Sequence, residues 1–195
     1  MSLLTVLYRY KKDCLKTMIE KLTLFLPYIV LLSHFFILIL VGLLVFRNSW
    51  GKKLENFIGK YSMLLAFLIS LSALIGSLFY SQIVGFEPCV LCWWQRVFIF
   101  PLPVIFGIAI WRKDRNIFNY VVPLAVLSAV VALYQSYVYL GGASFLPCTA
   151  VGGACSKVYV KVFGYITIPV MSLTISLYIL FIAWIHNKYE KNRNA

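Results

Sequence analysis

Long apolar runs alternate with short polar segments along the chain. Each of five runs has about the 20 residues that a helix needs to cross the hydrocarbon core of a bilayer. These runs cover residues 24–46, 61–81, 92–111, 119–140 and 164–185. The pattern predicts an all-α integral membrane protein with one helical domain over 61–185. The run over 24–46 is then an additional N-terminal transmembrane helix.

The two ends of the chain are polar. Residues 1–23 are basic, and four apolar residues recur there at helical spacing: Leu15, Met18, Ile19 and Leu22. This spacing is typical of an amphipathic helix at a membrane surface. Residues 186–195 form a short tail, which we expect on the cytoplasmic side.

Composition agrees with a lipid environment. Of 195 residues, 62% are hydrophobic and 12% are charged. In a typical soluble domain about half of the residues are apolar and about a quarter are charged. The net charge of +12 would suggest nucleic-acid binding in a soluble protein. Here the basic residues lie mostly in short segments between the apolar runs, so we expect no nucleic-acid partner.

Lysine and arginine residues predict the orientation of the last four runs. There are four of them in segment 47–60, three in 111–119 and three in 186–195. In contrast, there are none in segment 82–92 and two in 141–163. Cytoplasmic loops are enriched in these residues. We therefore expect a multi-pass protein in which segments 82–92 and 141–163 lie outside the cytoplasm.

The first run does not fit this charge pattern. If 24–46 spans the membrane once, the N-terminus lies outside, although 1–23 carries five positive residues. Either this tail is translocated against the charge bias, or the run turns back near Pro27 as a re-entrant segment. We favour a fifth span, and the other loops keep their side in both cases.

The two outer loops contain two close pairs of cysteines, Cys89 with Cys92 and Cys148 with Cys155, while Cys14 is left over. Thiols outside the cytoplasm are free to oxidise, so two disulfides are expected. Redox-active pairs are favoured over structural bridges, because closing an eight-residue loop gains only about 2.5 kcal/mol. A zinc site is a further alternative, but the second pair is Cys-x6-Cys and no histidine lies nearby.

The surroundings of Cys89 and Cys92 favour redox chemistry. The helix that follows Pro88 is predicted to begin at or near Cys92, and a helix N-terminus favours the thiolate form of a cysteine. Arg96 follows Cys92 by four residues, on the same helical face. An arginine inside a membrane is rare and usually functional. Its expected partner is a thiolate or a quinone carbonyl, with snorkelling toward the headgroups as the alternative.

Three neighbours of Arg96 are weaker candidates for ligand binding. Gln95 lies close to the face of Cys92 and Arg96. Trp93 and Trp94 fit an aromatic belt at the membrane interface, and they are also suited to forming a flat wall for a ring-shaped ligand.

Three stretches together form a specific set of motifs: Pro88-Cys89-x-x-Cys92-Trp93-Trp94-Gln95-Arg96 followed by Pro101-Leu102, Pro147-Cys148-x6-Cys155-Ser156, and Phe163-Gly164-Tyr165-Ile166-Thr167-Ile168-Pro169. With these motifs the chain resembles the DsbB/BdbC family of thiol oxidoreductases over about residues 61–185. The compact second loop and the Cys-Trp-x-Gln-Arg stretch are closer to the short-loop BdbC type.

The resemblance implies a four-helix transmembrane bundle in the bacterial inner (cytoplasmic) membrane. It implies that Cys148–Cys155 takes electrons from an extracytoplasmic DsbA-like protein of thioredoxin fold. Cys89–Cys92 would then pass them to a membrane quinone, ubiquinone or menaquinone, beside Arg96. Gln95 and Trp93 are further candidates for quinone binding, and no metal is expected. Such a chain of carriers keeps the bacterial periplasm oxidising.

The sequence departs from the family pattern in two places. The run over 24–46 is absent from the minimal pattern. The family also tends to carry histidine or glutamate near the outer end of its third core helix, where this chain has Tyr134-Gln135-Ser136-Tyr137. Helix packing is the favoured interpretation for this stretch, and a hydrogen bond from Tyr134 or Gln135 to the quinone is the alternative. His34 and His186 are poor candidates for the site because of their positions in the chain.

Two other functions compete with this interpretation. A thiol/quinone enzyme of the vitamin K epoxide reductase type has its loop cysteines before the Cys-x-x-Cys pair, and the order here is reversed. The other alternative is a membrane protein without catalytic activity, in which the disulfides are structural.

Overall fold

The structure is a computed structural model that describes residues 3–45, 49–143 and 158–194. This part of the chain is almost entirely helical, and its elements are α1 (Leu3–Val45), α2 (Ser49–Leu78), the π-helical turn η1 (Phe79–Ile83), α3 (Val90–Ile99), α4 (Pro101–Arg112), the 3-10 turn η2 (Arg115–Ile117), α5 (Phe118–Tyr139) and α6 (Ile168–Asn194). Among the described residues, five helical stretches are long and apolar enough to cross a membrane. The prediction of an all-α, multi-pass membrane protein is confirmed.

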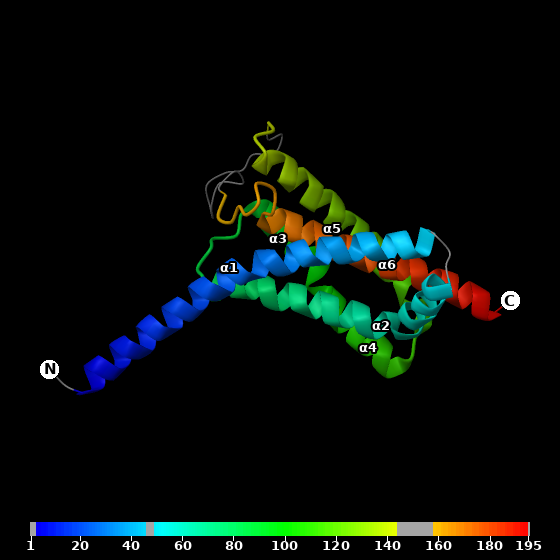
Figure 1. Cartoon of the computed structure of the whole chain (residues 1–195), viewed down its shortest axis with the longest axis horizontal. Coiled ribbons are helices and arrows are strands. Elements are labelled where there is room, and N and C mark those ends of the chain that lie inside the picture. Colours follow the sequence, from blue (N-terminus) through cyan, green and yellow to red (C-terminus); the bar gives the residue numbers. More distant parts are fainter. Residues whose placement is uncertain (1–2, 46–48, 144–157, 195) are drawn as a thin grey trace.

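Four of these stretches pack into a bundle. Helix α6 packs against α2 and α5, α4 packs against α2, and α3 packs against α5. Figure 1 shows α2, α5 and α6 side by side. Helices α3 and α4 together form one crossing, over Val90–Arg112. We call the end of the bundle with Cys89 the cysteine end. The opposite end, which carries Arg112, Lys113, Arg115 and Lys188, is the basic end.

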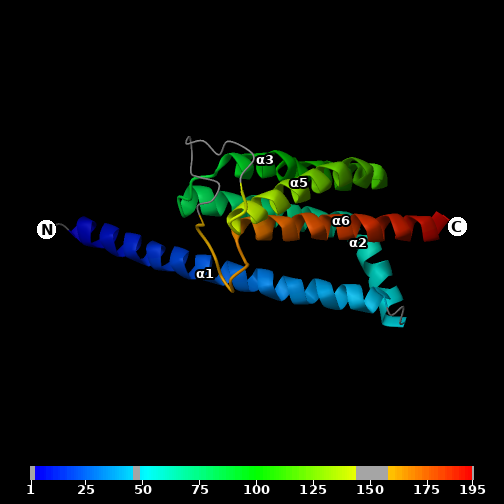
Figure 2. The same cartoon turned by 90° about the horizontal axis from the view of Figure 1, so that it is seen from above.

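The additional helix α1 lies along one side of the bundle. It has 43 residues, which at 1.5 Å per residue corresponds to a length of about 65 Å. Figure 2 shows its C-terminal half beside the bundle and its N-terminal half extending past the cysteine end. The helix runs through Pro27 without a break, so the structure does not contain the re-entrant turn that was the alternative for this run.

A proline separates α3 from α4. Pro101 has no backbone N–H and therefore cannot continue the helical hydrogen-bond ladder, but it is well accommodated as the first residue of a new helix. Phe100 still donates its N–H to the Arg96 carbonyl (2.9 Å) and has helical dihedral angles, so α4 follows α3 without an intervening loop. Both helices thus serve as a single transmembrane crossing.

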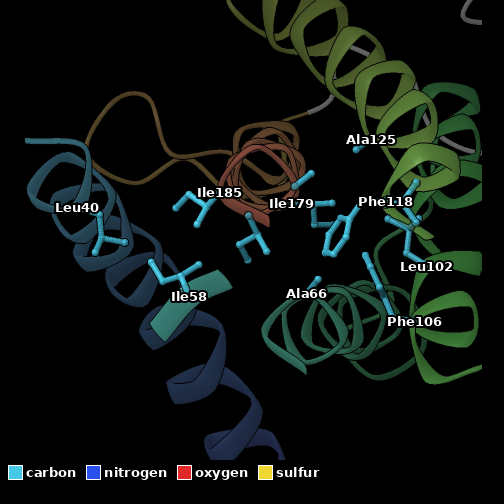
Figure 3. Packing of buried hydrophobic residues seen from close by; sticks show 12 residues of the cluster. Leu40, Ile58, Ala66, Leu102, Phe106, Phe118, Ala125, Ile179 and Ile185 are labelled. Carbon is cyan, nitrogen blue, oxygen red and sulfur yellow. The ribbon is translucent and has the colours of Figure 1, made fainter. Parts of the chain in front are cut away.

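The hydrophobic core is concentrated toward the basic end. Leu102 and Phe106 of α4 meet Phe118 of α5 there, with the Phe106 and Phe118 ring centroids 5.5 Å apart. Figure 3 shows Ile179 and Ile185 of α6 and Ala66 of α2 in the same cluster. Close packing of this kind associates helices in lipid, where the hydrophobic effect contributes little.

Candidate active site

Cys89 and Cys92 lie at the start of α3. The sequence predicted that this helix begins at or near Cys92; it begins at Val90, with Cys89 as the N-cap residue. The Cys89 sulfur accepts a hydrogen bond from the Cys92 N–H (3.4 Å). A cysteine sulfur can fill the N-cap position because the first N–H groups of a helix have no backbone partner. Both cysteines are therefore held by the first turn of α3.

The two sulfur atoms are 3.1 Å apart, and both thiols are free. A disulfide bond is about 2.05 Å long, so the sulfurs need to move by only about 1 Å to bond. Cys89 is buried and Cys92 is partly buried. The hydrogen bond with Cys92, followed by burial, raises the pKa of the Cys89 thiol above its usual range. The pair is thus arranged to change between dithiol and disulfide.

Gln135 of α5 contacts both sulfurs. Its Nε2 lies 3.3 Å from the Cys89 sulfur and 3.2 Å from the Cys92 sulfur, and donates to both. Its Oε1 accepts a hydrogen bond from Gln95 Nε2 at 2.7 Å. The side chains of Gln95 and Gln135 are almost completely buried. The sequence favoured a packing role for Gln135, and the contact of its side chain with the two sulfurs was missed. The only sign of that contact in the sequence was a glutamine within an apolar helix.

Arg96 lies one helical turn deeper than Cys92. Its Nε donates to the Ser77 hydroxyl (3.1 Å) and its Nη2 to the Ser77 carbonyl (3.4 Å). Its guanidinium carbon is 5.1 Å from the centroid of the Trp93 ring and 5.7 Å from that of the Phe100 ring. The ion pairs formed within the described ranges lie elsewhere. The guanidinium therefore keeps hydrogen-bonding capacity for an anionic or carbonyl ligand.

A cavity of about 550 Å³ connects these groups. Its lining comes from α1, α2, η1, α3, α5 and α6 and from residues 86–89 and 159, and it includes Cys89, Cys92, Gln95 and Arg96. Its other walls are mostly apolar. This volume is within the range of small-molecule binding sites, which are mainly apolar with a few polar groups.

Two hydroxyl groups that line the cavity have no hydrogen-bond partner among the described residues: those of Tyr80 and Ser172. Tyr80 lies in η1, where the α-helix widens to a π-helical turn at the end of α2. Such turns are frequent at functional sites. Buried hydroxyls are normally paired, so these two groups are available to a polar ligand.

The remaining sequence candidates lie in different places. Trp93 is 56% exposed, and its ring does not line the cavity. Cys148 and Cys155 lie outside the described residues, as does the side chain of Cys14. His34 of α1 is hydrogen-bonded to Thr174, and His186 is buried between Ser62 and the Arg115 carbonyl. Within the described ranges, no cluster of three metal-ligating side chains occurs.

Comparisons with known proteins agree on one family. Residues 59–186 match the family model described as disulfide bond formation protein DsbB. The chain is 35% identical over 137 residues to the probable disulfide formation protein C 2 of Bacillus anthracis, covering 70% of this chain and 98% of that protein.

Two proteins of Bacillus subtilis (strain 168) are also similar. Identity is 40% over 113 residues with the SPbeta prophage-derived disulfide bond formation protein B, covering 58% of this chain and 76% of the relative. Identity with disulfide bond formation protein C is 38% over 110 residues, covering 55% of this chain and 79% of the relative. No solved structure matches the chain.

Proposed function

The chain belongs to the DsbB family of disulfide bond formation proteins, and from this premise we propose that it is a membrane thiol:quinone oxidoreductase. In this proposal it reoxidises a DsbA-like dithiol protein outside the cytoplasm and passes the electrons to a membrane quinone. One observation carries the proposal: the paired Cys89 and Cys92 sulfurs, 3.1 Å apart, line the same largely apolar cavity as Arg96.

The residues of the cavity fit a quinone. Its ring is flat and apolar, and its two carbonyl oxygens accept hydrogen bonds. The Arg96 guanidinium and the unpartnered Tyr80 hydroxyl are donors on the cavity wall. A bound quinone would supply the oxidising power, since it takes up two electrons and two protons while the dithiol closes to a disulfide.

Each group of the site has a role in this reaction. Cys89 and Cys92 give up two protons and two electrons and form one S–S bond. Gln135 orients both sulfurs, and Gln95 in turn fixes the Gln135 amide. Arg96 would stabilise negative charge that develops on a carbonyl oxygen or a sulfur, as fixed positive groups do in sites that exclude water.

The second pair of cysteines links this site to the partner. A disulfide between Cys148 and Cys155 would oxidise the partner's dithiol, and Cys89–Cys92 would then reoxidise that pair. Each step is an attack of a thiolate on a disulfide through a mixed disulfide, so the number of electrons is conserved. Both pairs would act outside the cytoplasm.

The proposed location is the bacterial cytoplasmic membrane, with the cysteine end facing outward. The positive residues Arg112, Lys113 and Arg115 at the opposite end support this orientation. Since the N-terminal half of α1 extends past the cysteine end (Figure 2), Cys14 would also lie outside. An impermeant thiol reagent should then label Cys14 in intact cells. Labelling that appears only after lysis would contradict this orientation of α1.

The function is tested with the purified protein in lipid nanodiscs, a reduced DsbA-like protein and a quinone. We expect one hydroquinone for each disulfide formed in the partner. Cys89→Ser and Cys92→Ser should abolish turnover. Cys148→Ser and Cys155→Ser should block oxidation of the partner, while quinone still oxidises Cys89 and Cys92. Normal turnover by all four variants would show that the bridges are structural.

A further inference from the structure

Helix α1 forms part of the wall of the cavity that contains Cys89 and Cys92. The lining residues that it contributes lie on one face and are Leu26, Ile29, Val30, Ser33 and Phe36. All of them lie outside residues 59–186, the region that matches the family. The additional helix thus contributes to a site whose reactive groups lie in the family region.

This wall is fixed to α6. His34 Nε2 is hydrogen-bonded to Thr174 Oγ1 at 2.8 Å, and the Tyr178 hydroxyl donates to the Ser33 carbonyl at 2.5 Å. Nearer the cysteine end, the Tyr28 ring packs edge-on against Phe163, with 5.3 Å between the centroids. These contacts, spread over about two turns of α1 from Tyr28 to His34, hold its lining face toward the bundle.

The cavity is long and runs parallel to the helices. On α2 and the following turn η1 its lining residues extend from Ile69 to Ser81, which corresponds to about 18 Å along the helix axis. On α1 they extend from Leu26 to Phe36, or about 15 Å. A ring-shaped headgroup at the cysteines occupies only one end of a space of this length.

The polarity of the wall changes along this length. The cysteine end has Arg96, Gln95 and the two thiols, whereas Phe36, Ile69, Ile99, Ile175 and Tyr178 line the other end. Hydroxyl groups along the way are mostly satisfied within their own helices. Ser33 donates to the Val30 carbonyl and Ser72 to the Ile69 carbonyl. The long part of the cavity therefore offers mainly apolar contacts.

We infer that α1 forms a binding wall for the prenyl chain of the quinone, with the ring held at the cysteine end. This inference rests on the proposed function and adds a subsite to it. A prenylated quinone has a ring with polar oxygens at one end and a long apolar chain at the other. This change from polar to apolar follows the same order as the lining of the cavity, from the cysteine end inward. The residues of α1 would then determine the preference for chain length without touching the reacting atoms.

The test compares quinones that share a ring and differ in the chain. Suitable pairs are menadione with menaquinone-4 and ubiquinone-0 with ubiquinone-4. Their dissociation constants are measured by equilibrium binding to the full-length protein in nanodiscs, so that partition into the lipid is the same for every variant. Val30→Trp, which fills the apolar part of the cavity, should weaken binding of the chain-bearing quinone about tenfold, as losing contact with about two methylene groups would. Binding of the quinone without a chain should change less than twofold.

Leu32→Trp is the matched control. Leu32 is on the same helix, is 69% exposed and does not line the cavity, so its variant should bind both quinones as the wild type does. Equal weakening of both quinones by Val30→Trp, or no weakening of either, would overturn the inference while leaving the proposed function intact. A wild-type protein that neither binds nor reduces any of these quinones would refute both.

A second measurement is independent of the variants. A quinone with a photoactivatable group at the end of its prenyl chain is cross-linked to the wild-type protein, and the labelled peptides are mapped by mass spectrometry. We expect labelling of residues 26–36 together with the facing residues of α6, and competition by menaquinone-4 or ubiquinone-4. Labelling confined to residues 59–186 but absent from α1 would contradict the inference.

Discussion

The two ends of the bundle are built differently. At the basic end, His186 is buried and bonded on both sides, to Ser62 Oγ at 2.7 Å and to the Arg115 carbonyl at 3.0 Å. Lys188 pairs with Glu55 at 2.7 Å, and the large aromatic side chains of the core fill the interior. At the cysteine end there is instead a cavity of about 550 Å³, with two hydroxyl groups that lack partners in the described part of the chain.

The basic end of the bundle thus contributes mainly to stability, whereas the cysteine end has the features of a binding site. Filled volume and paired polar groups at the basic end hold the helices together. Open volume and available donors at the cysteine end cost stability, and they are what a ligand site requires. Substitutions at the two ends should therefore have separable effects, on unfolding at one end and on quinone chemistry at the other.

The largest effect on stability is expected from Phe106→Ala. This side chain is fully buried and packs on Phe118, so its removal should lower the free energy of unfolding by about 3–5 kcal/mol. Quinone affinity of the folded fraction should be unchanged. Denaturant titration in detergent measures the first quantity. Val104→Ala, in the same helix but 62% exposed, is the control and should cost less than about 1 kcal/mol. Equal losses in the two variants would contradict the assignment of the core.

Arg96→Met is expected to have the largest effect on quinone binding. Losing a charge-assisted hydrogen bond of about 1.5–3 kcal/mol would weaken quinone affinity about ten- to a hundredfold. Cys89 and Cys92 should still be able to form a disulfide, as titration of free thiols will show. Arg96→Lys keeps the charge without the planar guanidinium and should give an intermediate affinity. Unchanged quinone kinetics in Arg96→Met would exclude a carbonyl as the partner of Arg96.

Gln135→Leu should slow oxidation of the cysteine pair. The substitution removes the donor to both sulfurs and leaves the Gln95 amide without its 2.7 Å partner. The loss of about 1 kcal/mol of hydrogen bonding predicts a rate about fivefold lower in single-turnover oxidation. Gln135→Glu tests whether a hydrogen-bond acceptor can replace the amide donor that faces the sulfurs. Oxidation of the cysteine pair should be slower still in this variant. A normal rate in Gln135→Leu would mean that Gln135 only fills space.

The smallest effect is expected from Tyr80→Phe. Only the unpartnered hydroxyl is removed, so quinone affinity should fall about threefold to fivefold, as expected for one neutral hydrogen bond. Stability should stay the same or rise slightly, because a buried polar group without a partner is eliminated. Tyr120→Phe, 71% exposed near the basic end, should change neither quantity. A loss of stability without a loss of affinity in Tyr80→Phe would place this residue in the structural part of the bundle.

The sequence was sufficient to predict a multi-pass helical membrane protein and the closeness of Cys89 to Cys92. Runs of about 20 apolar residues have few alternatives to transmembrane helices. The placement of Arg96 one turn after Cys92 follows from helical periodicity. The structure agrees with the expected start of α3 near Cys92, and it adds that Cys89 is the N-cap, a position that the sequence did not indicate because cysteine is not among the usual N-cap residues.

Contacts between segments that are distant in the sequence could not be predicted from it. Gln135 reaches the sulfurs because one particular face of α5 packs on α3. Helices surrounded by lipid are apolar on all sides, so their sequences do not mark the packed face as those of soluble helices do. For the same reason, nothing in residues 24–46 indicated that Val30 and Phe36 would line a cavity with Cys89.

The central claim is that Cys89 and Cys92 pass two electrons to a quinone, and a single-turnover measurement tests it most directly. The Cys148→Ser/Cys155→Ser variant, reduced beforehand and embedded in nanodiscs, is mixed with excess quinone. Absorbance follows hydroquinone, and mass spectrometry after alkylation follows the thiols. The account predicts one hydroquinone per chain, formed at the same rate at which Cys89 and Cys92 become protected from alkylation. If both thiols remained reactive and no hydroquinone formed, the claim would be contradicted.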